Sequence, residues 1–448
     1  MTKFLWGNST SSMQTEGAYN EGGKGASVYD IREATENKSD WKVAIDEYHR
    51  YEEDIKLMAE MGMNCYRFQV SWSRIFPEGE GKVNEEGLEF YEDLIDTLLK
   101  YSIEPMICLY HFDMPLSLYE KYDGFSSRHV EEVFVNYGKL LIDRFHNKVK
   151  YRITFNEHNL YPMDMGFVIG GSKQDHTLEN VYNIQHYTLL AHAQIANYIH
   201  DNYENLQIGG MLAYSPYYPS SSNPEDVLLA NQYDRFLNKL YLDIFSGRNY
   251  PKFFLNYINK YQINIDFTKE DSYEFDRLYS DFMSFSYYQS QTVKANGKEF
   301  NSLIMDQIID NQYVDRSEWN WEIDPVGLRI SMERIFSDSN VPVFIIENGI
   351  GLREELPENE YIEDDIRISY HKSHIDQMKE AMKFGVDCMG YLAWGLIDIL
   401  SSSGDMSKRY GAVYVNRENH DLKDLRRIKK KSFDYFKTVF NQNILKEI

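Results

Sequence analysis

Short apolar runs alternate with longer amphipathic stretches along the whole chain. The short runs are bounded by turn-forming residues and predict β-strands, whereas the longer stretches repeat apolar residues every three or four positions and predict helices. The predicted strands are 4–8, 64–70, 105–110, 151–156, 208–214, 282–288, 343–347 and 389–394, and the main predicted helices are 46–61, 85–101, 130–146, 181–203, 364–384 and 431–440.

Eight predicted strands that alternate with helices favour an α/β fold, a single (β/α)8 TIM barrel. The sequence contains no Gly/Ser/Pro-rich linker, low-complexity tract or obvious repeat, so we expect residues 1–448 to form one domain. The active site of such a barrel lies at the C-terminal ends of its strands. Long loop-like stretches are expected around that site, and the candidates are 20–40, 214–225, 295–318 and 397–424.

Two of the predicted strands end on a glutamate. Glu157 closes the run that begins at Tyr151, and Glu347 closes the run that begins at Val343, directly before Asn348-Gly349. Burying a carboxylate at the end of a strand costs free energy, so a carboxylate in that position points to a catalytic or binding role. Such a residue could be an ordinary ion-pair partner, but two of them at a barrel mouth match the acid/base and nucleophile or base of a glycoside hydrolase.

Composition and charge exclude several classes of function. A net charge of −23 argues against nucleic-acid binding, which requires a basic surface. Cys65, Cys108 and Cys388 lie in apolar runs, are too few for a disulfide framework and indicate a reducing compartment. We find no signal-peptide pattern and no stretch of 18 apolar residues. We therefore expect a cytoplasmic protein without a membrane partner.

The sequence shows no sign of a metal or cofactor site. The helical histidines His186 and His192 are six positions apart, which does not fit the i, i+4 spacing of a helical metal site. No Gly-rich phosphate loop joins a strand to a helix. We expect neither a metal nor a cofactor.

Four motifs together resemble those of family 1 glycoside hydrolases. They are residues 4–17, residues 66–77, Thr154-Phe-Asn-Glu157 and Ile346-Glu347-Asn-Gly349, and the matching segments follow one another to about residue 437. The resemblance implies a retaining mechanism in which Glu347 is the nucleophile and Glu157 is the acid and then the base. It further implies that Asn156 holds a sugar hydroxyl, that Tyr288 donates to Glu347 and that Arg67, placed at the end of the second strand, keeps Glu347 ionised while Glu157 stays protonated.

The resemblance also assigns sugar-binding residues. Gln14 and His111 match positions that bind sugar hydroxyls, and Trp394 matches the tryptophan that forms the floor of the sugar site. A ring of that kind stacks on a pyranose face without requiring a particular hydroxyl pattern.

The segment after the eighth strand favours one branch of the family. The residue at position 401 is Ser, where the β-glucosidases of the family carry a Glu that grips an unmodified sugar, and Lys408 and Tyr410 follow. A hydroxyl, a cation and a second hydroxyl suit a phosphate, which a carboxylate would repel. The arrangement resembles the 6-phospho-β-glycosidases, and Ser402, where the galactosidases of that branch carry Trp, favours the gluco configuration. Phe112, Ser286 and the segment 321–328 agree with this branch.

The expected partner is therefore a small-molecule phosphorylated β-glucoside, with no nucleic acid and no membrane, and with the question of a homo-oligomer left open. Alternative hypotheses are a β-glucosidase for unphosphorylated or other 6-anionic sugars, a 6-phospho-β-galactosidase, or a carbohydrate-binding relative without catalysis. Two further expectations concern the aglycone side. The ring of His158 is a candidate for a contact with the aglycone or with the acid, and the segment 164–180 lacks a Gly/Pro-rich loop, which suggests an open site.

Overall fold

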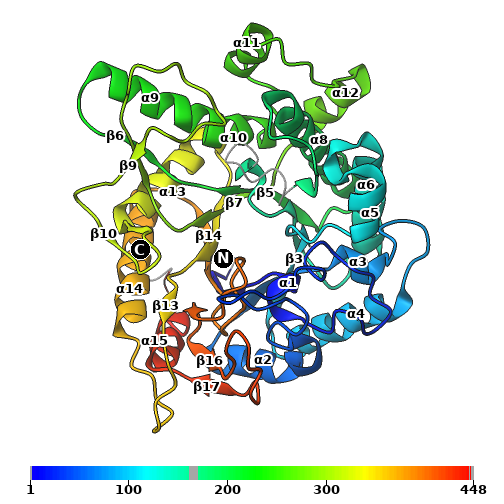
Figure 1. Cartoon of the computed structure of the whole chain (residues 1–448), viewed down its shortest axis with the longest axis vertical. Helices are drawn as coiled ribbons and strands as arrows, with labels where there is room; N and C mark the ends of the chain where they lie inside the picture. Colours follow the sequence, from blue (N-terminus) through cyan, green and yellow to red (C-terminus); the bar gives the residue numbers. More distant parts are fainter. Residues whose placement is uncertain (1–2, 161–169, 443, 445–448) are drawn as a thin grey trace.

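Eight parallel strands close into a barrel in the computed structural model, which describes residues 3–160, 170–442 and 444 (Figure 1). The order around the barrel is β1-β14-β12-β7-β5-β4-β3-β2, so the predicted (β/α)8 fold is confirmed. The strands are β1 (Leu5–Ser9), β2 (Cys65–Gln69), β3 (Glu104–Tyr110), β4 (Tyr151–Phe155), β5 (Gln207–Ala213), β7 (Phe282–Tyr287), β12 (Val343–Asn348) and β14 (Cys388–Trp394).

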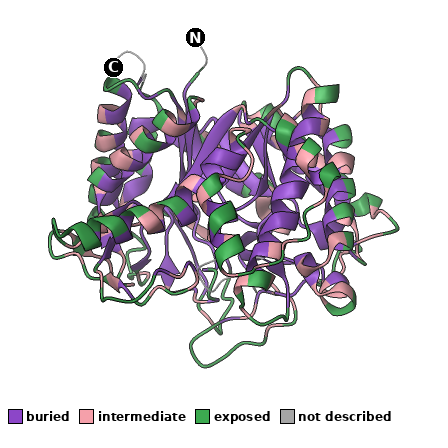
Figure 2. Ribbon diagram, turned by 90° about the horizontal axis from the view of Figure 1, so that it is seen from above, coloured by how far each residue is buried: buried purple, intermediate pink, exposed green. Residues whose placement is uncertain are grey.

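Helices surround the barrel and turn their apolar faces toward it (Figure 2). In α4 (Glu85–Lys100), for example, Leu88, Tyr91, Leu94, Ile95 and Leu98 are buried, which is the three-and-four spacing of an amphipathic helix. The other long helices are α2 (Glu47–Met61), α6 (Arg128–Phe145), α8 (Leu178–Asn202), α13 (Pro325–Ser339), α14 (Asp365–Lys383) and α15 (Lys431–Phe440). Shorter helices are α1 (Ser12–Thr15), α3 (Trp72–Ile75), α5 (Leu116–Tyr122), α9 (Pro224–Asp234), α10 (Leu240–Phe245), α11 (Lys252–Lys260) and α12 (Lys269–Arg277).

The barrel interior is a packed core of its own. Alternate residues of each strand point inward, and their side chains form one buried apolar cluster. Cys65 and Cys108 belong to this cluster, and Cys388 is buried in the layer between the barrel and the helices. All three thiols are free, as expected from the sequence. The other members of the inner cluster are Leu5, Met106, Tyr151, Ile153, Met211, Phe282, Phe344, Ile346 and Leu392.

Short β-structures lie in the long loops that follow the barrel strands. The stretches 295–318 and 397–424 were expected as loops, but they contribute strands to small sheets, because short paired segments satisfy backbone groups that a bare loop would leave open. The pairs are β10 (Asp315–Arg316) with β11 (Glu322–Ile323), β13 (Leu352–Arg353) with β15 (Lys408–Arg409), and β16 (Val413–Val415) with β17 (Arg427–Lys429), beside a sheet of β6 (Tyr217–Pro219), β8 (Gln291–Val293) and β9 (Ile308–Ile309).

The described helices include none with both the length and the apolar character needed to cross a membrane.

Candidate active site

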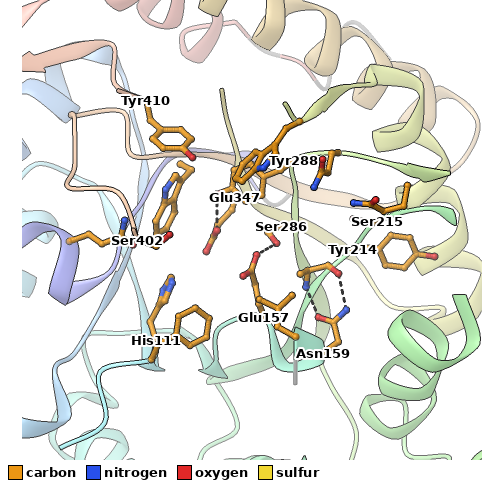
Figure 3. A pocket seen from close by; sticks show the side chains of 18 of the residues that line it. His111, Glu157, Asn159, Tyr214, Ser215, Ser286, Tyr288, Glu347, Ser402 and Tyr410 are labelled. Atoms are coloured by element: carbon orange, nitrogen blue, oxygen red, sulfur yellow. Dashed lines mark hydrogen bonds between the residues drawn. The ribbon is translucent and has the colours of Figure 1, made fainter. Parts of the chain in front are cut away.

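A cavity of about 340 Å³ lies at the C-terminal ends of the barrel strands, and both candidate glutamates line it (Figure 3). In Figure 3 the carboxylates of Glu157 and Glu347 point into the same hollow from different strands, with His111 on one side and Tyr410 on the other. The cavity wall also includes Gln14, Tyr288, Trp394 and Ser402. Eight of the residues expected from the sequence are therefore brought to one cavity.

Glu157 lies two residues beyond the end of β4 and adopts a strained backbone conformation. Its φ is 43°, in the left-handed region that residues other than glycine rarely adopt. Its N–H donates to the Met211 sulfur at 2.7 Å, and its Oε1 accepts from the Ser286 hydroxyl at 2.5 Å. Strain of this kind persists where the surroundings fix it and is concentrated at functional sites. Here it turns the carboxylate off the end of the strand into the cavity.

Glu347 is aimed by an irregularity in β12. Along β7, Phe285 pairs with Ile345 while the next residue, Ser286, pairs with Glu347, so Ile346 is an extra residue on β12. A bulge re-aims the side chain that follows it. The carboxylate accepts from Arg67 Nη1 at 3.0 Å on Oε1 and from the Tyr288 hydroxyl at 2.9 Å on Oε2.

Arg67 lies behind the cavity wall and joins three strands. Its position is the middle of β2, not the end of the strand as the sequence suggested, because β2 continues to Gln69. It is fully buried, and its Nη2 donates to Asn156 Oδ1 at 2.6 Å. Among the described residues, Nδ2 of Asn156 has no hydrogen-bond partner, which leaves that amide a free donor next to the two carboxylates.

Burial raises the pKa of both glutamates. For Glu157 burial is the largest cause, and the Ser286 hydroxyl and Arg67 oppose it. For Glu347 burial raises the pKa to about 8; Arg67 opposes the rise, and the neighbouring Glu157 adds to it. Arg67 thus favours the ionised form of Glu347, the effect expected from the sequence, while burial acts against it. The donors on both oxygens of Glu347 still make it the better anion of the pair.

The predicted sugar-binding residues line the cavity beside the glutamates. His111 stacks against Trp394 with ring centroids 5.6 Å apart. Burial and the nearby Arg67 lower the pKa of His111 well below its ordinary value, so the ring is neutral. Its Nδ1 has no hydrogen-bond partner among the described residues. Gln14 is held by two contacts, since Nε2 donates to the Leu400 carbonyl at 2.6 Å and Oε1 accepts from Ser11 at 2.8 Å.

The predicted phosphate-site residues lie in three different surroundings. Ser402 and Tyr410 line the main cavity. The hydroxyl of Ser401 instead accepts from the Asp405 N–H at 2.9 Å and lies 3.0 Å from the Ser403 hydroxyl. Lys408 lines a small adjoining cavity whose wall shares Tyr288 with the main one.

Three residues that the sequence did not single out as site residues also matter here. Trp321 and Asn159 line the main cavity, and Asn159 ties the Glu157 loop to β5 through the backbone of Ala213. Arg32 lies on the cavity wall with its guanidinium 4.0 Å from the Tyr29 ring centroid, and it forms no ion pair with the described carboxylates. Trp321 begins the segment 321–328 named above, whereas no sequence pattern marks Asn159 or Arg32.

His158 does not face the cavity. Its ring is fully buried between Phe155 and Phe245, with centroid distances of 4.6 and 5.5 Å. The expectation of a contact with the aglycone is wrong, because the left-handed turn at Glu157 directs the next side chain into the layer between barrel and helices. Part of the segment 164–180, residues 164–169, falls outside the described residues. Within the described residues, no group of three His, Cys, Asp or Glu side chains is placed to hold a metal ion.

Comparison with known proteins identifies related chains over nearly the full length. The model of the family described as "Glycosyl hydrolase family 1" matches residues 1–445. Aryl-phospho-beta-D-glucosidase BglA of Bacillus subtilis (strain 168) is 40% identical, covering 98% of each chain, and the 6-phospho-beta-glucosidase of Clostridium longisporum is 36% identical, covering 98% of this chain and 97% of the relative. Among solved structures, the family 1 b-glucosidase from Thermotoga maritima superposes with a TM-score of 0.88 at 30% identity, covering 98% of each chain.

Proposed function

The chain belongs to glycosyl hydrolase family 1, and we propose that it hydrolyses β-linked 6-phosphoglucosides to glucose 6-phosphate and an aglycone or sugar. The observation that carries this proposal is Lys408, a buried cation beside the cavity with no ion-pair partner among the described residues. A buried cation without a counter-ion is energetically unfavourable unless an anionic ligand pairs with it. The names of the relatives from Bacillus subtilis and Clostridium longisporum support the same substrate class.

The proposed chemistry uses the two glutamates in turn. Glu347 attacks the anomeric carbon and forms a covalent glycosyl-enzyme, while Glu157 gives its proton to the departing glycosidic oxygen. Glu157 then accepts a proton from water, whose oxygen replaces Glu347 at the anomeric carbon. Configuration is retained because the carbon is attacked twice from opposite faces.

Neighbouring side chains divide the two tasks between the glutamates. Glu347 receives hydrogen bonds from Arg67 and Tyr288, which stabilise its anionic form. Among the described residues, only the neutral Ser286 hydroxyl donates to the Glu157 carboxylate. In the reactive form, Glu157 therefore carries a proton and Glu347 is ionised. The Nδ2 donor of Asn156, which has no partner among the described residues, is placed to hold a sugar hydroxyl next to the reacting carbon.

Sugar specificity is proposed to follow from the strand-8 loop. Tyr410 on the cavity wall, Lys408 beside the cavity and Ser401 on the same loop would offer two hydroxyls and a cation to the 6-phosphate. The small side chain at position 402 leaves room above the sugar and favours the gluco configuration. A phosphorylated sugar does not cross membranes unaided, so we place the enzyme in the cytoplasm, where such substrates are formed on uptake.

Comparison of kcat/KM for 4-nitrophenyl β-glucoside and for its 6-phosphate tests the proposal. The wild type should prefer the phosphate strongly, and Lys408→Met should reduce kcat/KM for the phosphate by roughly 10- to 100-fold, since a charge-assisted contact contributes about 1.5–3 kcal/mol. The unphosphorylated glucoside should be little affected. Lys437→Met, which removes an exposed lysine far from the site, is the control. Equal activity of the wild type on both substrates would indicate an ordinary β-glucosidase instead.

A further inference from the structure

The side chain of Lys408 lies in a cage of aromatic rings. Its Nζ is 3.8 Å from the ring centroid of Trp321, 5.4 Å from that of Trp319 and 5.5 Å from that of Tyr410. All three distances are within the range of cation–π attraction. Lys408 is itself buried, with 8% of its surface exposed, so the rings replace much of the water around its ammonium group.

The cage holds this ammonium without a counter-ion. Within the described part of the chain, no carboxylate lies within ion-pair distance of Lys408, whereas the neighbouring buried cations are paired: Arg409 Nη1 lies 3.0 Å from Asp398, and Lys430 Nζ lies 2.6 Å from Glu354. Burial accordingly lowers the pKa of Lys408 to about 8, and only the field of Asp405 opposes the shift. Lys408 thus differs from the structural ion pairs of the same region.

The cage joins the β10–β11 turn, which carries Trp319 and Trp321, to β15, which carries Lys408. Lys408 on β15 pairs with Arg353 on β13. The N–H of Arg353 donates to Glu318 Oε2 at 2.9 Å, and its guanidinium lies 4.8 Å from the ring centroid of Trp319. The ring of Trp319, in the turn between β10 and β11, therefore lies within cation–π distance of both paired residues, Arg353 and Lys408.

Gly351 leaves the space through which the lysine stem passes. A Cβ at this position would lie 2.6 Å from Cγ and 2.8 Å from Cε of Lys408, closer than side chains approach. The absence of a side chain at 351 and the rings of Trp319 and Trp321 thus bound the same lysine from different sides.

We propose that Trp319 is a positioning residue that, together with Trp321, holds Lys408 as an unpaired cation for the 6-phosphate, and so sets how strongly the enzyme prefers phosphorylated β-glucosides. This inference rests on the proposed function. Trp319 lines the small cavity of Lys408 and is absent from the described wall of the main cavity, so it acts through the lysine. A carboxylate in place of Trp319 would also stabilise the ammonium group of Lys408, but the phosphate of each substrate would have to displace it. An aromatic ring stabilises the charge and leaves the N–H donors of Lys408 available to the phosphate.

The test measures the ratio of kcat/KM for 4-nitrophenyl β-glucoside 6-phosphate to that for the unphosphorylated glucoside. Trp319→Leu should lower this ratio by about 3- to 10-fold through a higher KM for the phosphate, and Trp319→Phe, which keeps a ring, should lower it less. In a Lys408→Met background, Trp319→Leu should change the ratio no further, because the lysine through which it acts is gone. Tyr313→Leu is the matched control, since Tyr313 is an aromatic residue of the same segment that is 85% exposed.

Gly351→Ala acts directly on the stem of Lys408 and provides a second variant if the enzyme does not fold with Trp319→Leu. It should lower the same ratio, because the added Cβ displaces the lysine stem. The inference is overturned if folded Trp319→Leu or Gly351→Ala enzyme keeps the wild-type ratio, or if both substrates lose activity equally. A wild type without preference for the phosphate would instead overturn the proposed function, and the inference with it.

Discussion

Ser286 lies opposite Glu347 in the pairing of β7 with β12, yet its hydroxyl donates to Glu157 at 2.5 Å. Ser286 therefore contacts the candidate acid, Glu157, although it lies on β7, the strand next to the one that carries the candidate nucleophile, Glu347. The contact stabilises the ionised form of Glu157 and opposes the rise in pKa that burial causes.

Ser286→Ala should therefore move the alkaline side of the pH–rate profile to higher pH. Without the hydroxyl, the pKa of Glu157 rises further, and the enzyme is active while Glu157 is protonated, so activity persists to higher pH. The measurement is kcat against pH with a substrate whose leaving group requires acid assistance. Ser284→Ala, on the same strand with its hydroxyl bonded to the Gly210 carbonyl, is the control. A shift toward lower pH would contradict the role given to Ser286.

Tyr288→Phe should act on the opposite side of the profile. The Tyr288 hydroxyl lowers the pKa of Glu347, so its removal raises that pKa further. Because Glu347 must be ionised to attack, the acid side of the kcat/KM profile should move to higher pH, and the rate at pH 6 should fall more than the rate at pH 8. Tyr287→Phe removes a hydroxyl that donates to the Asp324 carbonyl and serves as the comparison. An equal loss of activity at all pH values would indicate that the Tyr288 hydroxyl acts through packing and not through the pKa of Glu347.

Removal of each glutamate should separate their roles. Glu347→Ala should abolish turnover, since the covalent step has no other nucleophile. Glu157→Ala should retain the first step on substrates with good leaving groups, which need little protonation, and should lose it on alkyl glucosides. Nuclear magnetic resonance of the first product formed by the wild type should show the β-anomer. An α-anomer would exclude the retaining mechanism.

The barrel was predictable because its signal is repetitive. Each strand is a short apolar run buried on both faces, and each helix repeats its apolar stripe, so a one-residue error at an end such as Phe155 does not change the topology. The two glutamates were also predictable, since the carboxyl end of a parallel strand in a barrel faces the mouth.

Loop geometry could not be predicted in the same way. The aromatic cage brings Trp319 to Lys408 across a long stretch of chain. The short strands around it, such as the pair that joins Arg353 to Lys408, leave no periodic pattern in the sequence. The direction of the His158 ring depends on the left-handed turn at Glu157, which the sequence does not mark with a glycine. The charge of Glu347 depends on the balance between burial and Arg67, which only the folded structure determines.

A buried carboxylate outside the site gives a prediction about stability. Glu131, in the first turn of α6, is 1% exposed, and its Oε1 has no hydrogen-bond partner among the described residues. Burial raises its pKa from 4.5 to about 8, and Arg128 only partly opposes the rise. The folded protein therefore binds this proton more tightly than the unfolded chain does. The corresponding stability is fully present below pH 4.5 and is lost as the pH rises through about 8.

Glu131→Gln should remove this pH dependence, because the amide stays neutral. The variant and the wild type should have similar free energies of unfolding at pH 5, whereas at pH 8.5 the variant should be more stable by roughly 4 kcal/mol, since each unit of pKa shift corresponds to about 1.4 kcal/mol. Urea midpoints at the two pH values provide the measurement. Glu89→Gln is the control, since Glu89 is exposed and lies on a different helix, α4. If Glu131→Gln is less stable than the wild type at pH 8.5, then the carboxylate is ionised and stabilising there, and the effect assigned to burial is wrong.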